Sequence, residues 1–364
     1  MAEILGIGIS HYPPLSGRDE DMANILKGRL ADPGVPAAVK DPANWPEKMR
    51  SEWGNDEGRA GAGAHRAAML RGLYKARAAL DEFKPDWVLI WGDDQYENFR
   101  EDIIPPFCVM AYEDLSIRPW ADASASAMFS KDDDQWGSGK PNVWQESAEH
   151  SFRFRGQREA GKYLASALIE SDFDVAYAYK PLHHASLPHA YLNSVLYLDY
   201  ARKGFDYPIV PFQINCYGRL VVSHKGFISA FNDRSRPLDP PSPSPHRIFD
   251  LGAEVARICL ESPWRVALIA SSSWSHAFLV DKTWRMQPDI AQDRELYDAL
   301  ISRDFDRWRS TSLKQIEESG EQELLNWFAL VGAVKTLDLP CVWSDFVETY
   351  LFNSSKVTAI FRKG

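Results

Sequence analysis

Three short turns hold the residues of this sequence that are best suited to bind a metal or to move a proton. They are residues 10–14 (Ser-His-Tyr-Pro-Pro), 92–99 (Gly-Asp-Asp-Gln-Tyr-Glu-Asn-Phe) and 271–276 (Ser-Ser-Ser-Trp-Ser-His). Imidazole nitrogens and carboxylate oxygens bind divalent metals, and an imidazole also titrates near neutral pH. A metal site with an adjoining acid/base group is therefore the chemistry to consider first.

Each turn follows a short apolar run that predicts a buried β-strand. The three runs are residues 4–9, 87–91 and 264–270, and similar runs occupy 173–179 and 207–215. In open α/β sheets the loops after parallel strands converge at one edge, where ligand crevices form. We therefore expect the three turns to meet at the same edge of one sheet.

Helical periodicity separates these predicted strands. Apolar residues recur at helical spacing in residues 66–82, 157–170, 245–261 and 321–337. The alternation predicts an α/β fold with a central mixed sheet flanked by helices.

We expect a single domain over residues 1–364, with long loop insertions. The pattern is interrupted by charge, Gly and Pro at about residues 16–63, 112–150 and 234–245. Long loops of this kind in a compact domain are often functional covers.

Each candidate residue also has a purely structural interpretation. His11 could satisfy a backbone carbonyl within its turn, and Asp93 or Asp94 could close a turn or cap a helix. Glu323 lies in residues 319–327 (Ser-Gly-Glu-Gln-Glu-Leu-Leu-Asn-Trp), where an acidic side chain could favour a helix start through the helix dipole. The functional interpretation depends on three chemically similar turns at one predicted edge.

A second group of histidines follows another predicted strand. It consists of His183, His184 and His189, whose spacing fits no specific metal cage. These side chains could form the polar wall of a pocket, so all three are candidate substrate contacts. His189 could instead pack against the apolar run at 190–200.

The composition excludes several classes of partner. The chain carries 41 Lys and Arg against 51 Asp and Glu, a net charge of −10, and lacks the basic stripe that nucleic-acid binding requires. No run of about 18 apolar residues predicts a membrane span, and the N-terminus lacks the basic segment of a signal peptide. The four cysteines show no C-x-x-C spacing. We expect a cytoplasmic protein that binds neither nucleic acid nor membrane.

Five short motifs resemble the class III extradiol ring-cleavage dioxygenases, the superfamily of the protocatechuate 4,5-dioxygenase catalytic subunit and the gallate dioxygenases. The motifs are residues 10–13 (Ser-His-Tyr-Pro), 93–107 (Asp-Asp-Gln to Pro-Pro-Phe), 208–215 (Pro-Ile-Val-Pro-Phe-Gln-Ile-Asn), 272–276 (Ser-Ser-Trp-Ser-His) and 323–333 (Glu-Leu-Leu-Asn-Trp to Gly-Ala). Each motif is short, but all five follow the family's order, and together they span most of the chain.

The resemblance implies an activity and a set of roles. His11, Gln95 and Glu323 fall at the metal-ligand positions, and His276 falls at the position of the acid/base histidine. The implied enzyme binds Fe(II) and uses O₂ to open the ring of a small aromatic substrate such as a catechol, a gallate or an aminophenol. Family members commonly assemble as dimers or larger, so we expect a homo-oligomer.

Gln95 departs from the family's pattern, which has a second histidine ligand at this position. An amide oxygen is a weaker donor than an imidazole, so iron affinity should fall, or Asp93, Asp94 or Glu97 should contribute instead. Oxygen-rich ligands favour harder ions, and Mn(II) or Zn(II) are the alternatives to iron. Two other functions therefore stay open: a divalent-metal hydrolase on the same fold, and a non-catalytic homologue with a weakened metal site.

Overall fold

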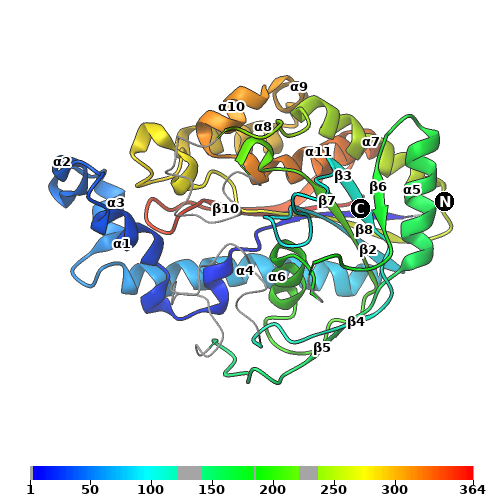
Figure 1. The fold of residues 1–364 in the computed structure, drawn as a ribbon, viewed down its shortest axis with the longest axis horizontal. Helices are drawn as coiled ribbons and strands as arrows, with labels where there is room; N and C mark the ends of the chain where they lie inside the picture. The colour runs from blue at the N-terminus through cyan, green and yellow to red at the C-terminus, as the bar shows by residue number, and fades with distance from the viewer. Residues whose placement is uncertain (1–2, 122–141, 184–185, 221–236, 364) are drawn as a thin grey trace.

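The computed structural model describes residues 3–121, 142–183, 186–220 and 237–363. Within these residues, eight strands form one sheet in the order β6-β3-β7-β2-β8-β1-β10-β9 (Figure 1). The strands are β1 (Ile4–Ile9), β2 (Trp87–Gly92), β3 (Phe107–Met110), β6 (Ala176–Ala178), β7 (Ile209–Ile214), β8 (Val266–Ser271), β9 (Cys341–Val347) and β10 (Lys356–Phe361). A separate ribbon pairs β4 (Leu115–Ile117) with β5 (Phe152–Phe154). The predicted α/β fold with a mixed central sheet is confirmed.

The centre of the sheet is parallel. β2 pairs in parallel with β7 and with β8, and β8 pairs in parallel with β1. Strands that are covered on both faces must be apolar at nearly every position, and every residue of these four strands is buried. Their carboxyl ends therefore share one edge of the sheet, which is where the three polar turns begin.

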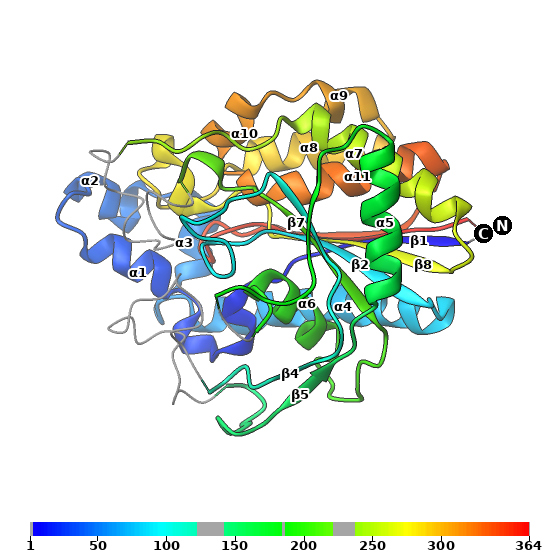
Figure 2. The same ribbon diagram turned by 45° about the vertical axis from the view of Figure 1, so that its right-hand side comes forward.

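Helices cover both faces of the sheet (Figure 1, Figure 2). One face carries α5 (Arg158–Glu170), α7 (Pro245–Glu261), α8 (Ile290–Ser302), α9 (Phe305–Ser310), α10 (Leu313–Ser319) and α11 (Leu325–Leu337). The other face carries α4 (Arg59–Phe83) and α6 (His189–Leu198). Side chains alternate along β2, so that Leu89 and Trp91 pack in the core with α7 and α11, whereas Val88 and Ile90 pack in the core with α4 and α6.

The predicted strands and helices are present, with some shifted ends. The helix expected over residues 321–337 begins only at Leu325, because Gln322–Leu324 form a 3-10 turn that ends in the helix. The sequence pattern missed β3, β9 and β10 of this sheet, as well as the ribbon of β4 and β5. In β10 the polar residues Lys356 and Thr358 alternate with Val357 and Ala359 but are buried like them, so the strand lacks the continuous apolar run by which the other buried strands are predicted.

The first predicted insertion, residues 16–63, folds into short helices rather than a plain loop. These are α1 (Asn24–Ala31), α2 (Ala37–Lys40) and α3 (Glu47–Trp53). Leu26 and Met49 bury their side chains in the core beside α4, which explains why this charged segment is ordered.

The other two predicted insertions are described only in part. β4 lies within residues 112–150, of which 122–141 fall outside the described residues. Residues 237–244 have no regular secondary structure and lead into α7. Among the helices in the described parts of the chain, none is both long and apolar enough to cross a lipid bilayer.

Candidate metal centre

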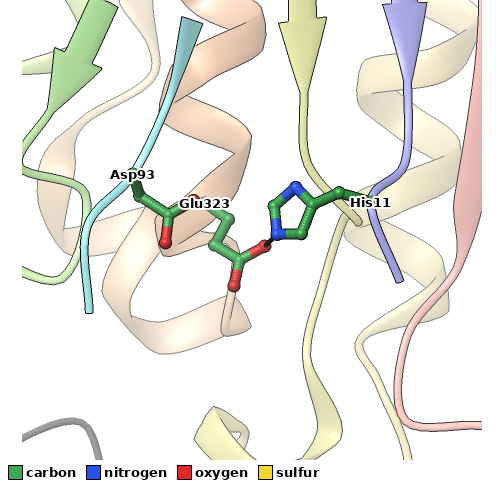
Figure 3. A group of neighbouring side chains, drawn as sticks. All are labelled: His11, Asp93 and Glu323. Carbon is green, nitrogen blue, oxygen red and sulfur yellow. Dashed lines mark ion pairs between the residues drawn. The ribbon is translucent and has the colours of Figure 1, made fainter. Parts of the chain in front are cut away.

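His11, Asp93 and Glu323 meet at the carboxyl edge of the sheet. Each offers a ligand atom, and these atoms lie within 4.8 Å of one another (Figure 3). His11 follows β1 and Asp93 follows β2, while Glu323 lies in the 3-10 turn before α11. All three side chains are buried. The fold thus brings together residues that are more than 300 positions apart in the sequence.

The hydrogen bonds of His11 fix which ring nitrogen faces this cluster. Its Nδ1 lies 3.1 Å from the carbonyl oxygen of Ser271 and 3.0 Å from the hydroxyl oxygen of the same residue. A carbonyl oxygen can only accept, so Nδ1 carries the hydrogen and Nε2 keeps its lone pair. This Nε2 lies 3.6 Å from Oε2 of Glu323. Burial, aided by His189 and His276, holds the pKa of His11 well below its usual value, and the ring is neutral as metal binding requires.

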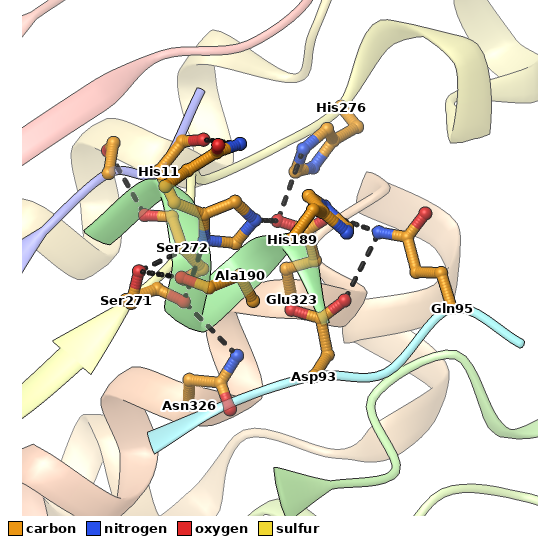
Figure 4. A network of polar contacts seen from close by, with 12 residues as sticks. His11, Asp93, Gln95, His189, Ala190, Ser271, Ser272, His276, Glu323 and Asn326 are labelled. Atoms are coloured by element: carbon orange, nitrogen blue, oxygen red, sulfur yellow. Dashed lines mark hydrogen bonds and ion pairs between the residues drawn. The ribbon is translucent and has the colours of Figure 1, made fainter. Parts of the chain in front are cut away.

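The two oxygens of Glu323 have different surroundings (Figure 4). Oε1 accepts a hydrogen bond of 2.7 Å from the Tyr217 hydroxyl and one of 2.9 Å from Nε2 of Gln95. Oε2 has no donor among the described residues, and it lies 3.5 Å from Nε2 of His276. Burial, with Asp93 close by, raises the pKa of Glu323 to about 8. Glu323 thus presents one oxygen without a described donor to both imidazoles, and a cation bound there would replace the proton that this carboxyl group otherwise holds near pH 7.

Gln95 lies between the two acidic side chains. Its Nε2 donates to Oδ2 of Asp93 at 3.1 Å as well as to Glu323, and its Oε1 has no partner in the described structure. Oδ1 of Asp93 also lacks a described donor. The amide thus turns its nitrogen, not its oxygen, toward the carboxylates.

Asp94 performs a structural role in the same turn. Its carboxyl oxygens accept hydrogen bonds of 3.0, 2.9 and 3.3 Å from the backbone N–H groups of Glu97, Asn98 and Phe99. Such a side chain closes a turn by pairing its own backbone. The structural interpretation weighed for this residue fits the geometry, and Asp94 is not part of the group around His11.

His276 lies in the turn after β8. Its backbone N–H donates to the carbonyl of Gly320 at 2.8 Å, and a β-bridge to Ser354 holds the other side of the turn. Burial, followed by the charge of Lys356, lowers the pKa of His276 to about 3, so that the imidazole is neutral near pH 7. Its ring is therefore able to accept a proton next to the Glu323 carboxylate.

His189, at the first position of α6, pairs with Glu97. The imidazole Nδ1 and the backbone N–H of His189 each lie 2.9 Å from an oxygen of Glu97. Burial lowers the pKa of His189, but the nearby acids Glu97, Asp93 and Glu323 together outweigh this effect and raise it to about 9. The ring lies edge-on to that of His11, with 5.0 Å between the ring centroids. The structure therefore adds a cationic imidazole to the same cluster.

His183 is exposed, and its Nε2 pairs with Asp102 at 2.8 Å, so it is not part of the cluster. His184 lies outside the described residues.

Two residues of the centre were not singled out in the sequence. Ser271 fixes the tautomer of His11, and Tyr217 donates to Glu323. Tyr217 follows β7, whose carboxyl end lies at the same edge as those of β1, β2 and β8. Extending the strand-end rule to the apolar run at 207–215 could have found it.

The side chains present fit a divalent cation. Oδ1 of Asp93 and Oε2 of Glu323 are buried acceptors without a described donor, and the lone pair of His11 Nε2 faces Oε2 of Glu323. Acceptors left without donors in a protein interior cost free energy, and a cation bound among them would satisfy all three. One imidazole and two carboxylates form a harder ligand set than two imidazoles and one carboxylate.

The sequence was also compared with those of known proteins. No protein-family model matches the sequence. The chain is 22% identical over 202 residues to 2,3-dihydroxyphenylpropionate/2,3-dihydroxicinnamic acid 1,2-dioxygenase 2 of Pseudomonas putida. The similarly named dioxygenases of Paraburkholderia phymatum and Burkholderia vietnamiensis are 27% identical over 202 residues and 26% identical over 201 residues.

Each of these three alignments covers 55% of this chain and 46% of the relative. The chain therefore matches its curated relatives over about half of their length. The matches confirm the resemblance to the class III extradiol dioxygenases. The relatives' names specify a 2,3-dihydroxyphenyl group, which is a catechol.

Proposed function

We propose that this protein is a metal-dependent extradiol dioxygenase that opens a catechol-type ring with O₂. The observation that carries the proposal is the neutral imidazole of His276 at 3.5 Å from the bare oxygen of Glu323, a carboxylate that also faces His11. A proton acceptor directly beside three side chains that could hold a metal supports this chemistry. The similarity to dioxygenases that act on catechols supports the same chemistry.

We propose His11, Asp93 and Glu323 as the residues that hold the metal, and Fe(II) as the metal. Bound iron would supply a path for electrons from the chelated substrate to O₂. The ligand set is rich in oxygen, so Mn(II) and Zn(II) remain alternatives. The family's second-histidine position is occupied by Gln95, whose amide nitrogen faces the carboxylates.

His276 would act as the acid/base group. A catechol hydroxyl at the centre would give its proton to the neutral imidazole, and the negative charge of the resulting catecholate would stabilise the imidazolium. The imidazolium could then return the proton to an oxygen of the opening ring. Glu97 holds His189 in its cationic form. The His189 imidazolium would donate a hydrogen bond to the anionic substrate.

A pocket beside the centre offers room for part of an aromatic substrate. It has a volume of about 170 Å³ and is lined by Tyr217, Gln322 and Phe278, among others. The Phe278 ring lies 5.2 Å from that of His276, centroid to centroid. Arg219 and Arg285 also line this pocket together with their ion-pair partners Glu317 and Asp281, so its walls combine apolar groups with charges of both signs.

The test is anaerobic loading of the full chain with Fe(II), followed by addition of a panel of catechols, gallates and aminophenols under air. We expect oxygen uptake together with a coloured ring-opened product. Loaded protein that consumes no oxygen with any member of the panel would contradict the proposal.

The carboxylate-rich ligand set also fits a hydrolase that uses Mn(II) or Zn(II) to activate water. Oxygen-independent turnover of an ester or amide would favour this second function. Absence of stoichiometric metal after reconstitution would favour a non-catalytic homologue. Cytoplasmic location and homo-oligomeric assembly stay predictions.

A further inference from the structure

We infer that Gln95 and Tyr217 are positioning residues, which turn one bare oxygen of each carboxylate toward the metal, and that Gln95 acts as a donor and not as a ligand. The inference rests on the proposed metal centre of His11, Asp93 and Glu323. It assigns a role to the position at which this chain departs from the family it resembles.

The hydrogen bonds divide the four carboxylate oxygens into two kinds. Gln95 Nε2 has two N–H groups and two acceptors, Oδ2 of Asp93 at 3.1 Å and Oε1 of Glu323 at 2.9 Å. The Tyr217 hydroxyl adds a second donor to Oε1 of Glu323 at 2.7 Å. The other oxygen of each carboxylate has no described donor. In each acid, one oxygen therefore accepts hydrogen bonds from the protein, and the other oxygen is available to bind a cation.

Electrostatics explains why the amide nitrogen faces inward. Asp93 and Glu323 are both buried, and two carboxylates in a medium of low polarity repel each other. The N–H groups of Gln95 lie between them and reduce this repulsion. Turning the amide by 180° would place its oxygen against both acids, with acceptor facing acceptor. The present orientation leaves Oε1 of Gln95 without a partner instead.

The two donors reach Glu323 from neighbouring strands. Gln95 belongs to the turn after β2, Tyr217 to the turn after β7, and these strands pair in parallel. Because both donate to the same oxygen, either one can still orient the carboxylate when the other is lost. The effects of removing them should therefore not be independent.

The test is a double-mutant cycle on metal affinity, using Gln95→Met, Tyr217→Phe and the double variant of the full chain. Co(II) is the probe, added anaerobically without catechol and followed by calorimetry and by visible absorption. Outer partners of metal ligands typically contribute about 10–100-fold in affinity. We expect each single variant to lose about tenfold, and the double variant to lose at least about threefold more than the product of the single effects.

The visible spectrum supplies a readout that a general loss of stability would not change. In the double variant no donor holds Oε1, so Glu323 becomes able to bind through both oxygens, and the Co(II) bands should change in intensity as the coordination number rises. In Tyr217→Phe, where Gln95 still donates to Oε1, the bands should change much less. Tyr197→Phe is the matched control, because its buried hydroxyl donates at 3.1 Å to the backbone carbonyl of Pro13, away from the carboxylates. This control should keep the wild-type affinity and spectrum.

Three results would overturn the inference. Independent effects of the two changes, with Tyr217→Phe behaving like Tyr197→Phe, would show that Gln95 binds the metal itself. An unchanged Co(II) affinity in the double variant would show that neither Gln95 nor Tyr217 influences metal binding. A wild-type chain that binds no Co(II) would overturn the proposed metal centre, and the inference with it. A wild-type chain that binds Co(II) but opens no ring would fail only the proposed function, because the cycle needs neither catechol nor O₂.

Discussion

His11 and His276 both face Oε2 of Glu323, at 3.6 and 3.5 Å, but the protein holds the two rings differently. The Nδ1 of His11 is fixed by Ser271, whereas the Nδ1 of His276 has no hydrogen-bond partner among the described residues. A ring with a fixed tautomer suits a metal ligand, and a ring with an uncommitted nitrogen suits proton transfer.

This difference predicts that the two histidines fail in different ways. His276→Ala should lower kcat by about 10²–10⁴-fold while the protein still binds about one equivalent of Fe(II). His11→Ala should bind much less iron and lose activity for that reason. Iron content measured beside steady-state oxygen uptake separates the two outcomes. Full activity in His276→Ala would show that another group carries the proton.

At the scale of the element, the turn after β2 is organised by one side chain. Asp94 accepts three backbone N–H groups of the turn, and Tyr96 takes a left-handed conformation with φ of +61°. The turn presents Asp93 and Gln95 to the proposed metal centre, and Glu97 to His189. The conformation of this turn therefore positions three side chains, those of Asp93, Gln95 and Glu97.

Removing the Asp94 side chain should damage both stability and metal binding. In Asp94→Ala the three buried N–H groups lose their acceptor, which should lower the free energy of unfolding by about 2–4 kcal/mol. Asp94→Asn keeps one acceptor oxygen, so its free energy of unfolding should fall by less than half of that amount. Urea denaturation and metal titration of both variants provide the measurement. Equal stability of the Ala and Asn variants would contradict this role.

A second buried acid links the turn after β8 to the segment before α11. Asp293 accepts the backbone N–H of Ser275 at 2.9 Å and contacts the carboxyl group of Glu321. Burial raises the pKa of Asp293 from 3.8 to about 7. In the unfolded chain this carboxyl ionises near pH 4, so between pH 4 and 7 the unfolded state holds fewer protons than the folded state.

The sign of the effect follows from this difference. The contribution of Asp293 to stability falls as the pH rises from 4 to 7, and it stays low above pH 7. Asp293→Asn does not titrate, so we expect its stability relative to the wild type to improve by roughly 2 kcal/mol between pH 4.5 and pH 8. Thermal unfolding at both pH values measures this. A constant difference between variant and wild type would mean that Asp293 does not titrate as described.

At the scale of the whole molecule, the strands and their polar ends could be predicted from the sequence, because buried parallel strands require apolar runs. The side-chain partners could not. Gln95 and Glu323 are 228 positions apart, and only their rotamers decide that nitrogen and not oxygen faces the acids. β10 escaped prediction because Lys356 is buried by donating to backbone carbonyls at Phe352 and Ser354, a solution that no local pattern reveals.

We propose that the chain forms one domain. β1 and β10 come from opposite ends of the sequence and pair with each other inside the same sheet, between β8 and the edge strand β9. The helix that follows Glu323, α11, packs tightly on α7, because two glycines remove side chains from the contact. A Cβ added at Gly252 would lie 1.8 Å from the carbonyl oxygen of Ala329, and one at Gly332 would lie 2.0 Å from that of Phe249.

This close contact predicts that a methyl group far from the centre alters it. Gly252→Ala should push α11 away from α7 and lower the free energy of unfolding by about 2–4 kcal/mol. Since α11 begins two residues after Glu323, metal affinity should fall as well. Gly28→Ala is the matched control, because Gly28 lies exposed in α1 with no atom within 4 Å of an added Cβ, and the change should be neutral or stabilise by up to about 1 kcal/mol. The urea midpoints and Co(II) affinities of the two variants are the measurements that distinguish Gly252→Ala from its control. If Gly252→Ala matched Gly28→Ala in both measurements, the helix pair would not be what positions the Glu323 carboxylate.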